Sequence, residues 1–250
     1  MMVDKVKTNY EKESIVPVPY KRKVRLLLWG GAATPGDNSA FEWATLNVMK
    51  DYKANDKSST IERHQIRVAQ DIIKHINGQE DGSIRSLDLF THGGMQALYL
   101  TTAAPSTNAT LRYVLHNSSL YRSRTRMILN AAGWTKGSAL VSEITFSKFA
   151  TNAKIELHGC KTAGTESDDD NITADFSTQL AKAGKSASVV IGHADQANPN
   201  IKGGGEKNSE QDYRHGRRVI FSKGKIIQVT KQKRHLAERD LEALAKKTQP

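Results

Sequence analysis

Short runs of apolar residues recur along the chain, and polar or glycine-rich stretches separate them. Four of these runs predict buried strands, and the first, 24–29, is nearly unbroken, which is typical of a strand buried on both faces of a parallel sheet. We expect these strands at 24–29, 86–91, 154–158 and 188–192. Two later runs, 217–221 and 225–230, flank Ser222-Lys-Gly224 and predict a hairpin.

Between these strands the apolar residues fall at helical spacing. The pattern predicts a helix from Asn38 or Ser39 to about residue 52, and a second from the capping sequence Ser58-Ser-Thr-Ile-Glu62 through Ile76. Further helices are expected over 138–150, 172–183 and 235–247, and a short extended return over 97–100. Strands that alternate with helices favour an α/β fold of three layers, in which helices cover both faces of a mostly parallel central sheet.

The domain organisation follows from length and regularity. With 250 residues and 38% apolar composition, the chain is long enough for one domain with a sizeable core. Residues 1–20 lack periodicity and are expected to form an N-terminal arm, which leaves a single domain over 21–250. Within it, we expect an insertion over the cleft at 101–137 and a mobile loop in the Gly- and Asn-rich segment 198–216.

The sequence contains no membrane or disulfide signal. No apolar run approaches the ~18 residues that a membrane helix needs, and residues 1–13 are too polar for a secretory signal peptide. The single cysteine excludes an internal disulfide and a Cys-x-x-Cys metal motif. We therefore expect a cytoplasmic protein, or one exported without a classical signal peptide, that does not contact a membrane.

Positive charge is concentrated at the two ends of the chain. Of the net charge of +11, residues 1–25 carry +4 (seven basic, three acidic), 26–201 carry none, and 202–250 carry +7 (thirteen basic, six acidic). Basic ends suit an acidic partner or nucleic acid, and they also suit an ordinary solvated surface. Because the Arg and Tyr spacing matches no nucleic-acid-binding module, a nucleic-acid partner is not expected.

The candidate chemistry lies where two of the expected strands end. Cys160 follows 154–158 in the sequence Leu157-His-Gly-Cys-Lys-Thr-Ala-Gly164, and His92 follows 86–91 in Phe90-Thr-His-Gly-Gly94. The carboxyl ends of parallel strands open onto the crevice where α/β proteins bind ligands. If the two strands are neighbours, Cys160 and His92 form a nucleophile and base pair.

The pairs His92-Gly93 and Gly159-Cys160, each after an apolar strand, resemble the caspase-like (clan CD) cysteine peptidases. They are most similar to bacterial members in toxins and effectors, whose cysteine strand continues as Gly-Cys-x-Thr-(Ala/Gly)-Gly, a helix and a Val-Val-Ile-Gly strand. The resemblance spans roughly 24–229. It implies a caspase-like fold and an endopeptidase for protein or peptide substrates, with His92 and Cys160 as the catalytic pair and Gly93 as oxyanion support. It implies no cofactor.

The tetrahedral intermediate of such a reaction needs backbone donors, and the amides of Gly93 and Cys160 are the natural pair. His158 points to the same side of its strand as Cys160, so it either lines the substrate pocket or is buried with a polar partner. We prefer His92 as the base, because a histidine two residues away on one extended strand cannot easily turn onto the thiol.

Four further residues are assigned to the substrate pocket together with His158. Gly30 and Gly31 form the loop after the first strand, which borders the substrate cleft in the family that the chain resembles. His193 and Asp195 follow the fourth strand. In several members of that family an acidic residue just before the cysteine selects basic side chains. His158 and Gly159 precede Cys160 here, so the preferred substrate residue stays open.

Two loops are candidate ligand sites. Gly31-x4-Gly36 is followed by Asp37-Asn38 rather than by Lys and Ser or Thr, which argues against a phosphate loop. The acidic run 168–170 matches no known calcium loop and is expected to be solvated, so no metal site is expected.

Two alternatives to a peptidase remain open. The first is a non-enzymatic binding protein with a decayed site, which would use its basic ends to hold nucleic acid or an acidic protein. The second is another thiol hydrolase, such as an acyltransferase or a deamidase, because Cys/His pairs serve acyl transfer generally. The oligomeric state is not indicated by the sequence.

Overall fold

The structure is a computed structural model that describes residues 22–32, 35–101, 117–123, 137–164, 170–204 and 207–247. The arm expected over 1–20 and most of the insertion expected over 101–137 lie outside these ranges. Within them, no helix combines the length and apolar character needed to cross a bilayer.

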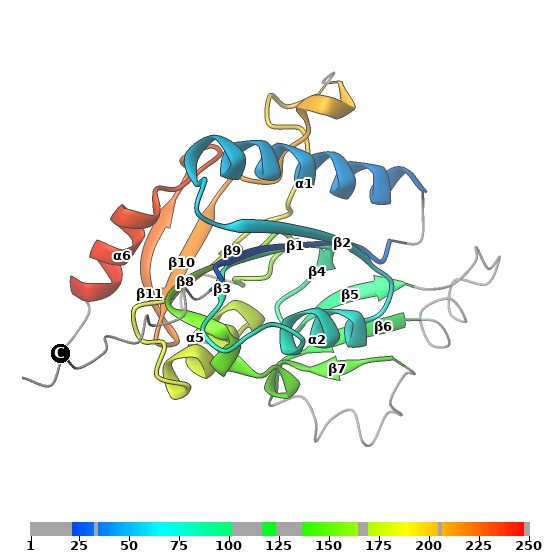
Figure 1. Cartoon of the computed structure of the whole chain (residues 1–250). Coiled ribbons are helices and arrows are strands. Elements are labelled where there is room, and N and C mark those ends of the chain that lie inside the picture. Colours follow the sequence, from blue (N-terminus) through cyan, green and yellow to red (C-terminus); the bar gives the residue numbers. More distant parts are fainter. Residues whose placement is uncertain are drawn as a thin grey trace, which may run out of the picture.

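A seven-stranded sheet forms the centre of the molecule (Figure 1), in the order β11-β10-β9-β8-β3-β1-β2. The expected buried strands are confirmed as four parallel neighbours in this sheet. The expected hairpin forms its antiparallel edge. The strands are β1 (Val24–Gly30), β2 (Thr60–Ile66), β3 (Ile84–Phe90), β8 (Phe149–Leu157), β9 (Val189–His193), β10 (Arg218–Ser222) and β11 (Lys225–Thr230).

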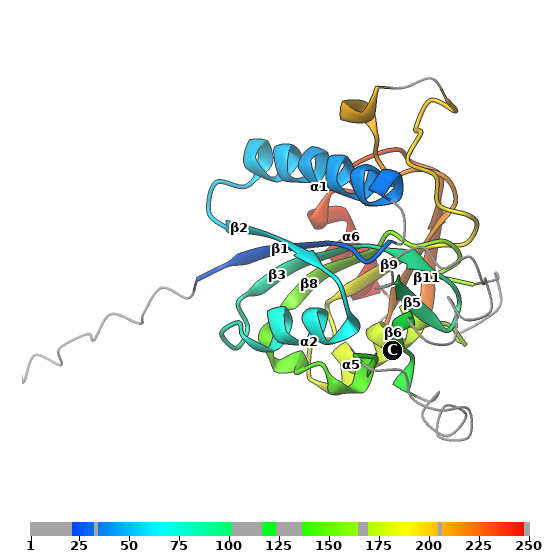
Figure 2. The same ribbon diagram turned by 90° about the vertical axis from the view of Figure 1, so that its right-hand side faces the viewer.

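Helices cover both faces of the sheet (Figures 1 and 2). On one face lie α1 (Pro35–Asn55) and α6 (Glu238–Lys247), and on the other lie α2 (Ala69–Asn77) and α5 (Ile172–Lys182). The three-layer α/β arrangement is therefore confirmed. Three of the predicted helices, near 38–52, 172–183 and 235–247, are confirmed as α1, α5 and α6.

The two faces of the sheet differ in chemistry. The face under α2 and α5 is aliphatic, with Leu26, Leu89 and Ile155 in one continuous buried cluster with both helices. The opposite face is apolar where α1 and α6 pack on it. On the part of this face between the areas that α1 and α6 cover, Asp88 of β3 and Glu156 of β8 lie side by side in register and are fully buried. Charged side chains thus occupy the middle of the layer under α1 and α6.

A small second sheet starts where β3 ends. It has the order β4-β5-β6-β7, and its first strand contains His92 itself. The extended segment expected at 97–100 is confirmed as β5. The strands are β4 (His92–Gly93), β5 (Ala97–Thr101), β6 (Asn117–Tyr121) and β7 (Ala139–Leu140).

The second predicted helix is confirmed only in its latter part, as α2, and the helix predicted over 138–150 is wrong. Residues 60–66 form the edge strand β2, which pairs along all of β1, and the helix begins only at Ala69, where the Asp71 carboxylate accepts from the Arg67 and Val68 amides. Residues 138–150 form β7, two single 3-10 turns and the first residues of β8. Strand pairing outweighs the local pattern in both segments: residues 60–66 pair with β1, and Phe149 pairs with Ile84 of β3.

Candidate functional site

The two candidate catalytic residues leave neighbouring strands at the same edge of the central sheet. β3 and β8 are parallel and adjacent, and the His158 amide continues their pairing by donating to the Leu89 carbonyl at 2.8 Å. His92 follows β3 by two residues and Cys160 follows β8 by three. Both side chains are half-buried. The sheet order therefore brings the segments that carry His92 and Cys160 together, as the sequence predicted.

The backbones beside these two residues touch. A Cβ atom on Gly93 would lie 3.0 Å from the Gly159 Cα, and one on Gly159 would lie 2.9 Å from the Gly93 Cα. Side chains at these positions would push the two segments apart, because real Cβ atoms do not approach other atoms so closely. Glycine at both positions is thus what lets the histidine segment pack on the cysteine segment.

Thr162 holds the turn that presents the thiol. Its methyl group fills the space beside Gly93, and its hydroxyl donates to the Gly159 carbonyl at 3.1 Å and accepts from the His193 amide at 3.0 Å. No separate role for Thr162 was predicted from the sequence. Its position two residues after the cysteine, in the Cys-x-Thr sequence, was the available signal.

The residue directly after the cysteine has an unusual backbone conformation. Lys161 has a φ of 54°, which is uncommon for a residue other than glycine. Its amide donates to the Asp195 carbonyl at 2.8 Å, and the Ala163 amide donates to the His193 carbonyl at 2.9 Å. These bonds tie the cysteine turn to the chain that leaves β9 and hold the strained residue in place.

The thiol faces the segment that follows β9. Cys160 Sγ lies 3.7 Å from the Ala197 carbonyl oxygen, to which it donates. The His92 ring packs edge-on against Phe41 of α1, with ring centres 5.4 Å apart. Cys160 is therefore bordered by the segment that contains Ala197, and His92 by α1. The oxyanion role of the Gly93 and Cys160 amides stays a prediction.

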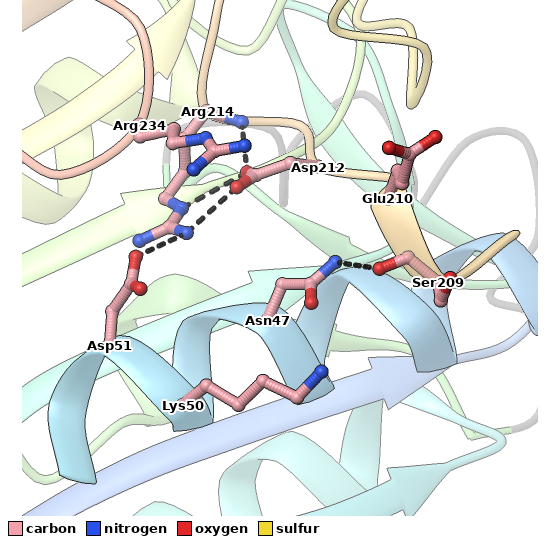
Figure 3. Close-up of a pocket in the computed structure, with 8 residues that line it drawn as sticks. All are labelled: Asn47, Lys50, Asp51, Ser209, Glu210, Asp212, Arg214 and Arg234. Atoms are coloured by element: carbon pink, nitrogen blue, oxygen red, sulfur yellow. Dashed lines mark hydrogen bonds and ion pairs between the residues drawn. The ribbon is translucent and has the colours of Figure 1, made fainter. Parts of the chain in front are cut away.

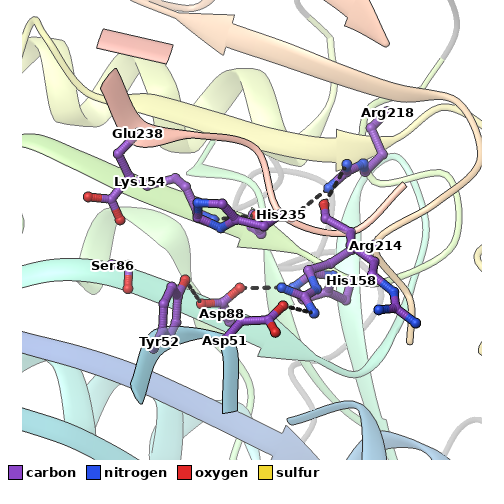
Figure 4. Close-up of polar contacts among 12 residues, drawn as sticks. Asp51, Tyr52, Ser86, Asp88, Lys154, His158, Arg214, Arg218, His235 and Glu238 are labelled. Carbon is purple, nitrogen blue, oxygen red and sulfur yellow. Dashed lines mark hydrogen bonds and ion pairs between the residues drawn. The ribbon is translucent and has the colours of Figure 1, made fainter. Parts of the chain in front are cut away.

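His158 is buried rather than exposed in a pocket. Its side chain is 1% exposed, and its Nε2 lies 3.0 Å from an Asp88 oxygen (Figure 4). Its ring stacks on that of Phe90, with ring centres 4.1 Å apart. The Tyr52 hydroxyl donates to the other Asp88 oxygen at 2.7 Å. Burial, and then the Asp88 charge, raise the pKa of Tyr52. These contacts argue against the predicted pocket role and favour the alternative of a buried histidine with a partner.

Beside His158 lies a buried ionic network (Figure 4). Glu156 is contacted by Lys154 Nζ at 2.6 Å and by Arg218 at 3.1 Å. Burial opposes ionisation of Glu156, but the charges of Lys154 and Arg218 outweigh it and hold its pKa well below the usual range. Asp88, Glu156 and His158 place ligand atoms within 4.8 Å of one another. Because Glu156 is neutralised by two cations of the protein, we assign no metal to this cluster.

The structure also buries three other residues assigned to the pocket. His193 is 4% exposed, and burial, together with His158 and Arg218, lowers its pKa to about 3. A Cβ on Gly30 would lie 2.5 Å from the Ile66 carbonyl oxygen, and one on Gly31 2.8 Å from Leu100. The burial of His193, Gly30 and Gly31 argues against a direct substrate contact.

Asp195, the fifth residue assigned to the pocket, is exposed. Its carboxylate receives a two-pronged contact from Arg217, at 3.1 and 2.9 Å. The hydrogen bond from Arg217 lowers the pKa of Asp195.

The segment 207–214, part of the loop expected to be mobile, is anchored on α1. The buried Arg214 binds Asp212 at 2.7 Å and Asp51 of α1 at 2.8 Å (Figure 3). Asn47 donates to the carbonyls of Ser209 at 3.0 Å and Gln211 at 2.8 Å. These residues surround a polar pocket of about 230 Å³. This anchor was not predicted from the sequence, because its residues on α1 lie more than 160 positions from those in the loop.

Comparison with known proteins gives no further assignment, since no protein-family model and no curated protein matches the chain.

Proposed function

We propose that the protein is a cysteine endopeptidase of the caspase-like type, in which Cys160 is the nucleophile and His92 the general base and acid. The observation that supports it most is the contact between Gly93 and Gly159, with a Cβ on either residue coming within 3.0 Å of the other's Cα. This contact joins the ends of β3 and β8 and places a histidine and the chain's only cysteine at one sheet edge. A thiol and an imidazole on touching segments are the parts that acyl transfer needs.

The proposed reaction has two stages. His92 takes the thiol proton, the Cys160 sulfur bonds to the substrate carbonyl carbon, and the carbonyl oxygen becomes an oxyanion. The carbon–nitrogen bond then breaks as His92 returns the proton to the leaving amine. Water, deprotonated by His92, hydrolyses the thioester and releases the acid and the free thiol. General acid–base catalysis of this kind contributes ~10²–10⁴-fold.

The half-buried state of the thiol and the strained turn after it support this assignment over an inert cysteine. A structural cysteine is usually packed within a strand and needs no special backbone. Cys160 instead lies beyond the end of β8, next to Lys161 with its φ of 54°. Strained backbone conformations cluster at functional sites.

A peptide-library digest tests this function. The wild-type protein is expected to cleave internal peptide bonds, and Cys160→Ser and His92→Ala are expected to lose at least ~10²-fold in rate with an unchanged circular dichroism spectrum. Release of ammonia from glutamine side chains without chain cleavage would instead indicate a deamidase. Cleavage that survives in Cys160→Ser would rule out the proposed nucleophile.

A further inference from the structure

A second, strongly basic hollow lies beside the candidate nucleophile. It has a volume of about 780 Å³ and is formed by three segments that are far apart in the sequence: 195–203, 215–217 and 231–233. Among the described residues that line it, Lys202, Arg217, Lys231 and Lys233 are positive and Asp195 is negative. The lining therefore carries a formal charge of +3, within a chain whose residues 26–201 are neutral overall.

The hollow shares a wall with the candidate active site. Asp195 and Asn198 line the hollow, and Ala197 between them accepts from the Cys160 thiol at 3.7 Å. The Asp195 carbonyl accepts from the Lys161 amide at 2.8 Å. A polypeptide that reaches Cys160 across this wall would place its neighbouring side chains in the basic hollow.

The hollow is held open by contacts among its own walls. The His215 ring contacts the Asn198 carbonyl at 2.5 Å, and Lys233 donates to the Ile201 carbonyl at 3.0 Å. The Asp212 amide donates to the Pro199 carbonyl at 2.8 Å, and Arg214 fastens this part of the chain to α1. A ligand therefore meets cations that are already positioned, which lowers the entropic cost of binding.

The contact of Asp195 with Arg217 indicates which kind of group the cations of the hollow bind. Its carboxylate lies across Arg217 in a two-pronged geometry, which is the arrangement in which arginine recognises carboxylates. Arg217 is paired with Asp195 and Lys202 with Glu210 at 2.8 Å, so Lys231 and Lys233 supply the positive charge that suits further acidic groups.

From these observations we propose that the hollow binds an acidic stretch of the substrate polypeptide, with two or more Asp or Glu side chains near the bond that Cys160 attacks. This inference rests on the proposed function, and it gives that function a substrate class. The basic C-terminal part of the chain thereby has a defined role, since Lys202, Arg217, Lys231 and Lys233 all come from it.

Binding is measured in the Cys160→Ser protein, so that the result does not depend on turnover. The probes are a fluorescein-labelled peptide with four consecutive glutamates and a matched peptide with four glutamines, compared by fluorescence anisotropy. The glutamate peptide is expected to bind more tightly, and its affinity to fall as salt is raised. Lys231→Gln/Lys233→Gln is expected to weaken its binding about five- to tenfold.

Three variants isolate the charge effect. Lys231→Arg/Lys233→Arg keeps the charge and should keep the affinity. Lys231→Gln alone leaves the contact of Lys233 with Ile201 intact and should still weaken binding. Lys53→Gln/Lys182→Gln removes two exposed cations outside the hollow and should bind like the parent protein.

Equal binding of the two peptides, or equal loss in the Lys53→Gln/Lys182→Gln control, would overturn the proposal. A single-stranded oligonucleotide that binds over tenfold more tightly than the glutamate peptide, and is lost in Lys231→Gln/Lys233→Gln, would also overturn it by assigning the hollow to phosphates. Failure of the library digest with intact glutamate-peptide binding would reject the peptidase and leave the acid-binding hollow standing.

Discussion

At the scale of single residues, the residues of the candidate site differ in how far their positions could be predicted from the sequence. The positions of His92 and Cys160 at strand ends were predictable from the sequence, because an apolar run followed by a polar residue and glycine has a recognisable pattern. Residues whose role depends on a partner, such as Asp88 and Thr162, were not. Nothing local in the sequence indicates that Asp88 lies 3.0 Å from His158, seventy positions away.

His158 makes a testable structural contribution. His158→Ala would leave a cavity against Phe90 and remove one partner of the buried Asp88, so we expect a loss of about 2–4 kcal/mol in unfolding free energy. The measurement is chemical denaturation of His158→Ala, Asp88→Asn and the double variant. Additive losses would show that the two side chains do not interact.

His193 predicts a pH dependence of stability. Its pKa is about 3 in the folded protein and about 6.5 in an unfolded chain. Between these values the unfolded chain binds a proton that the folded protein does not, so stability falls as the pH falls below about 6.5.

When the pH is lowered from 6.5 to 5, the protonation of this one group in the unfolded chain should reduce the free energy of unfolding by about 2 kcal/mol. Urea denaturation of the wild type and of His193→Gln at both pH values measures this contribution, as the difference between the two proteins in the unfolding free energy lost on acidification. The variant is expected to lose less stability on acidification, and equal losses would contradict the assignment of a buried neutral imidazole.

At the scale of elements, the continuous apolar strands were the part of the fold most predictable from sequence. β1 and β9 are buried along their whole length, and β3 and residues 153–157 of β8 almost as fully. Burial of that kind leaves a nearly unbroken apolar run in β1, whereas β3 and β8 place charged residues between their apolar ones. β2 is an edge strand with mostly half-exposed residues, and its charged sequence was interpreted as a helix. The helix predicted over 138–150 was wrong because the apolar residues of this segment fill the core at irregular spacing.

The contact between the β4 segment and the cysteine turn gives an element-scale prediction. Gly93→Ala and Gly159→Ala each force a methyl group to within about 3 Å of the opposing backbone. We expect each to separate the two segments and lower peptide cleavage by more than about tenfold, while the central sheet stays folded. Rates from the library substrate and circular dichroism spectra measure the two effects.

Gly78→Ala is the matched control for these variants. Gly78 lies at the end of α2 with an ordinary φ of −74°, and the nearest atom to an added Cβ is 3.1 Å away. Its cleavage rate should equal that of the wild type. Full activity in both Gly93→Ala and Gly159→Ala would show that the close approach has no functional role.

At the scale of the whole molecule, a stable layered sheet carries a site made of loops. The central strands are covered on both faces, whereas residues 194–204 and 207–217 are mostly loop and are held at particular points, such as the contacts of Arg214 with Asp51 and of Lys233 with Ile201. Sequence composition indicated a mobile loop there, because Gly and Asn are frequent, but it could not show the long-range contacts that anchor parts of it.

Amide hydrogen exchange tests this distribution of stability. We expect β3 and β8 to exchange slowest, since both are interior strands of the sheet. Exchange should be fast at Gly204, where an added Cβ would meet no atom within 4 Å. Within the same loop, exchange should be slower at Asp212 and Arg214, whose amides are hydrogen-bonded. Uniform protection across 198–216 would contradict both the predicted mobility and the observed anchors.

The central claim is that Cys160 and His92 act as one unit, and the alkylation rate of the single thiol tests it most directly. Iodoacetamide modification is followed by mass spectrometry at pH 6.5 in the folded wild type and in His92→Ala, with glutathione as the reference thiol. A neighbouring imidazolium favours the thiolate, so Cys160 should react about tenfold faster than the reference, and His92→Ala should remove that excess. A thiol that stays unreactive in the folded protein, or one whose rate is unchanged by His92→Ala, would contradict the account.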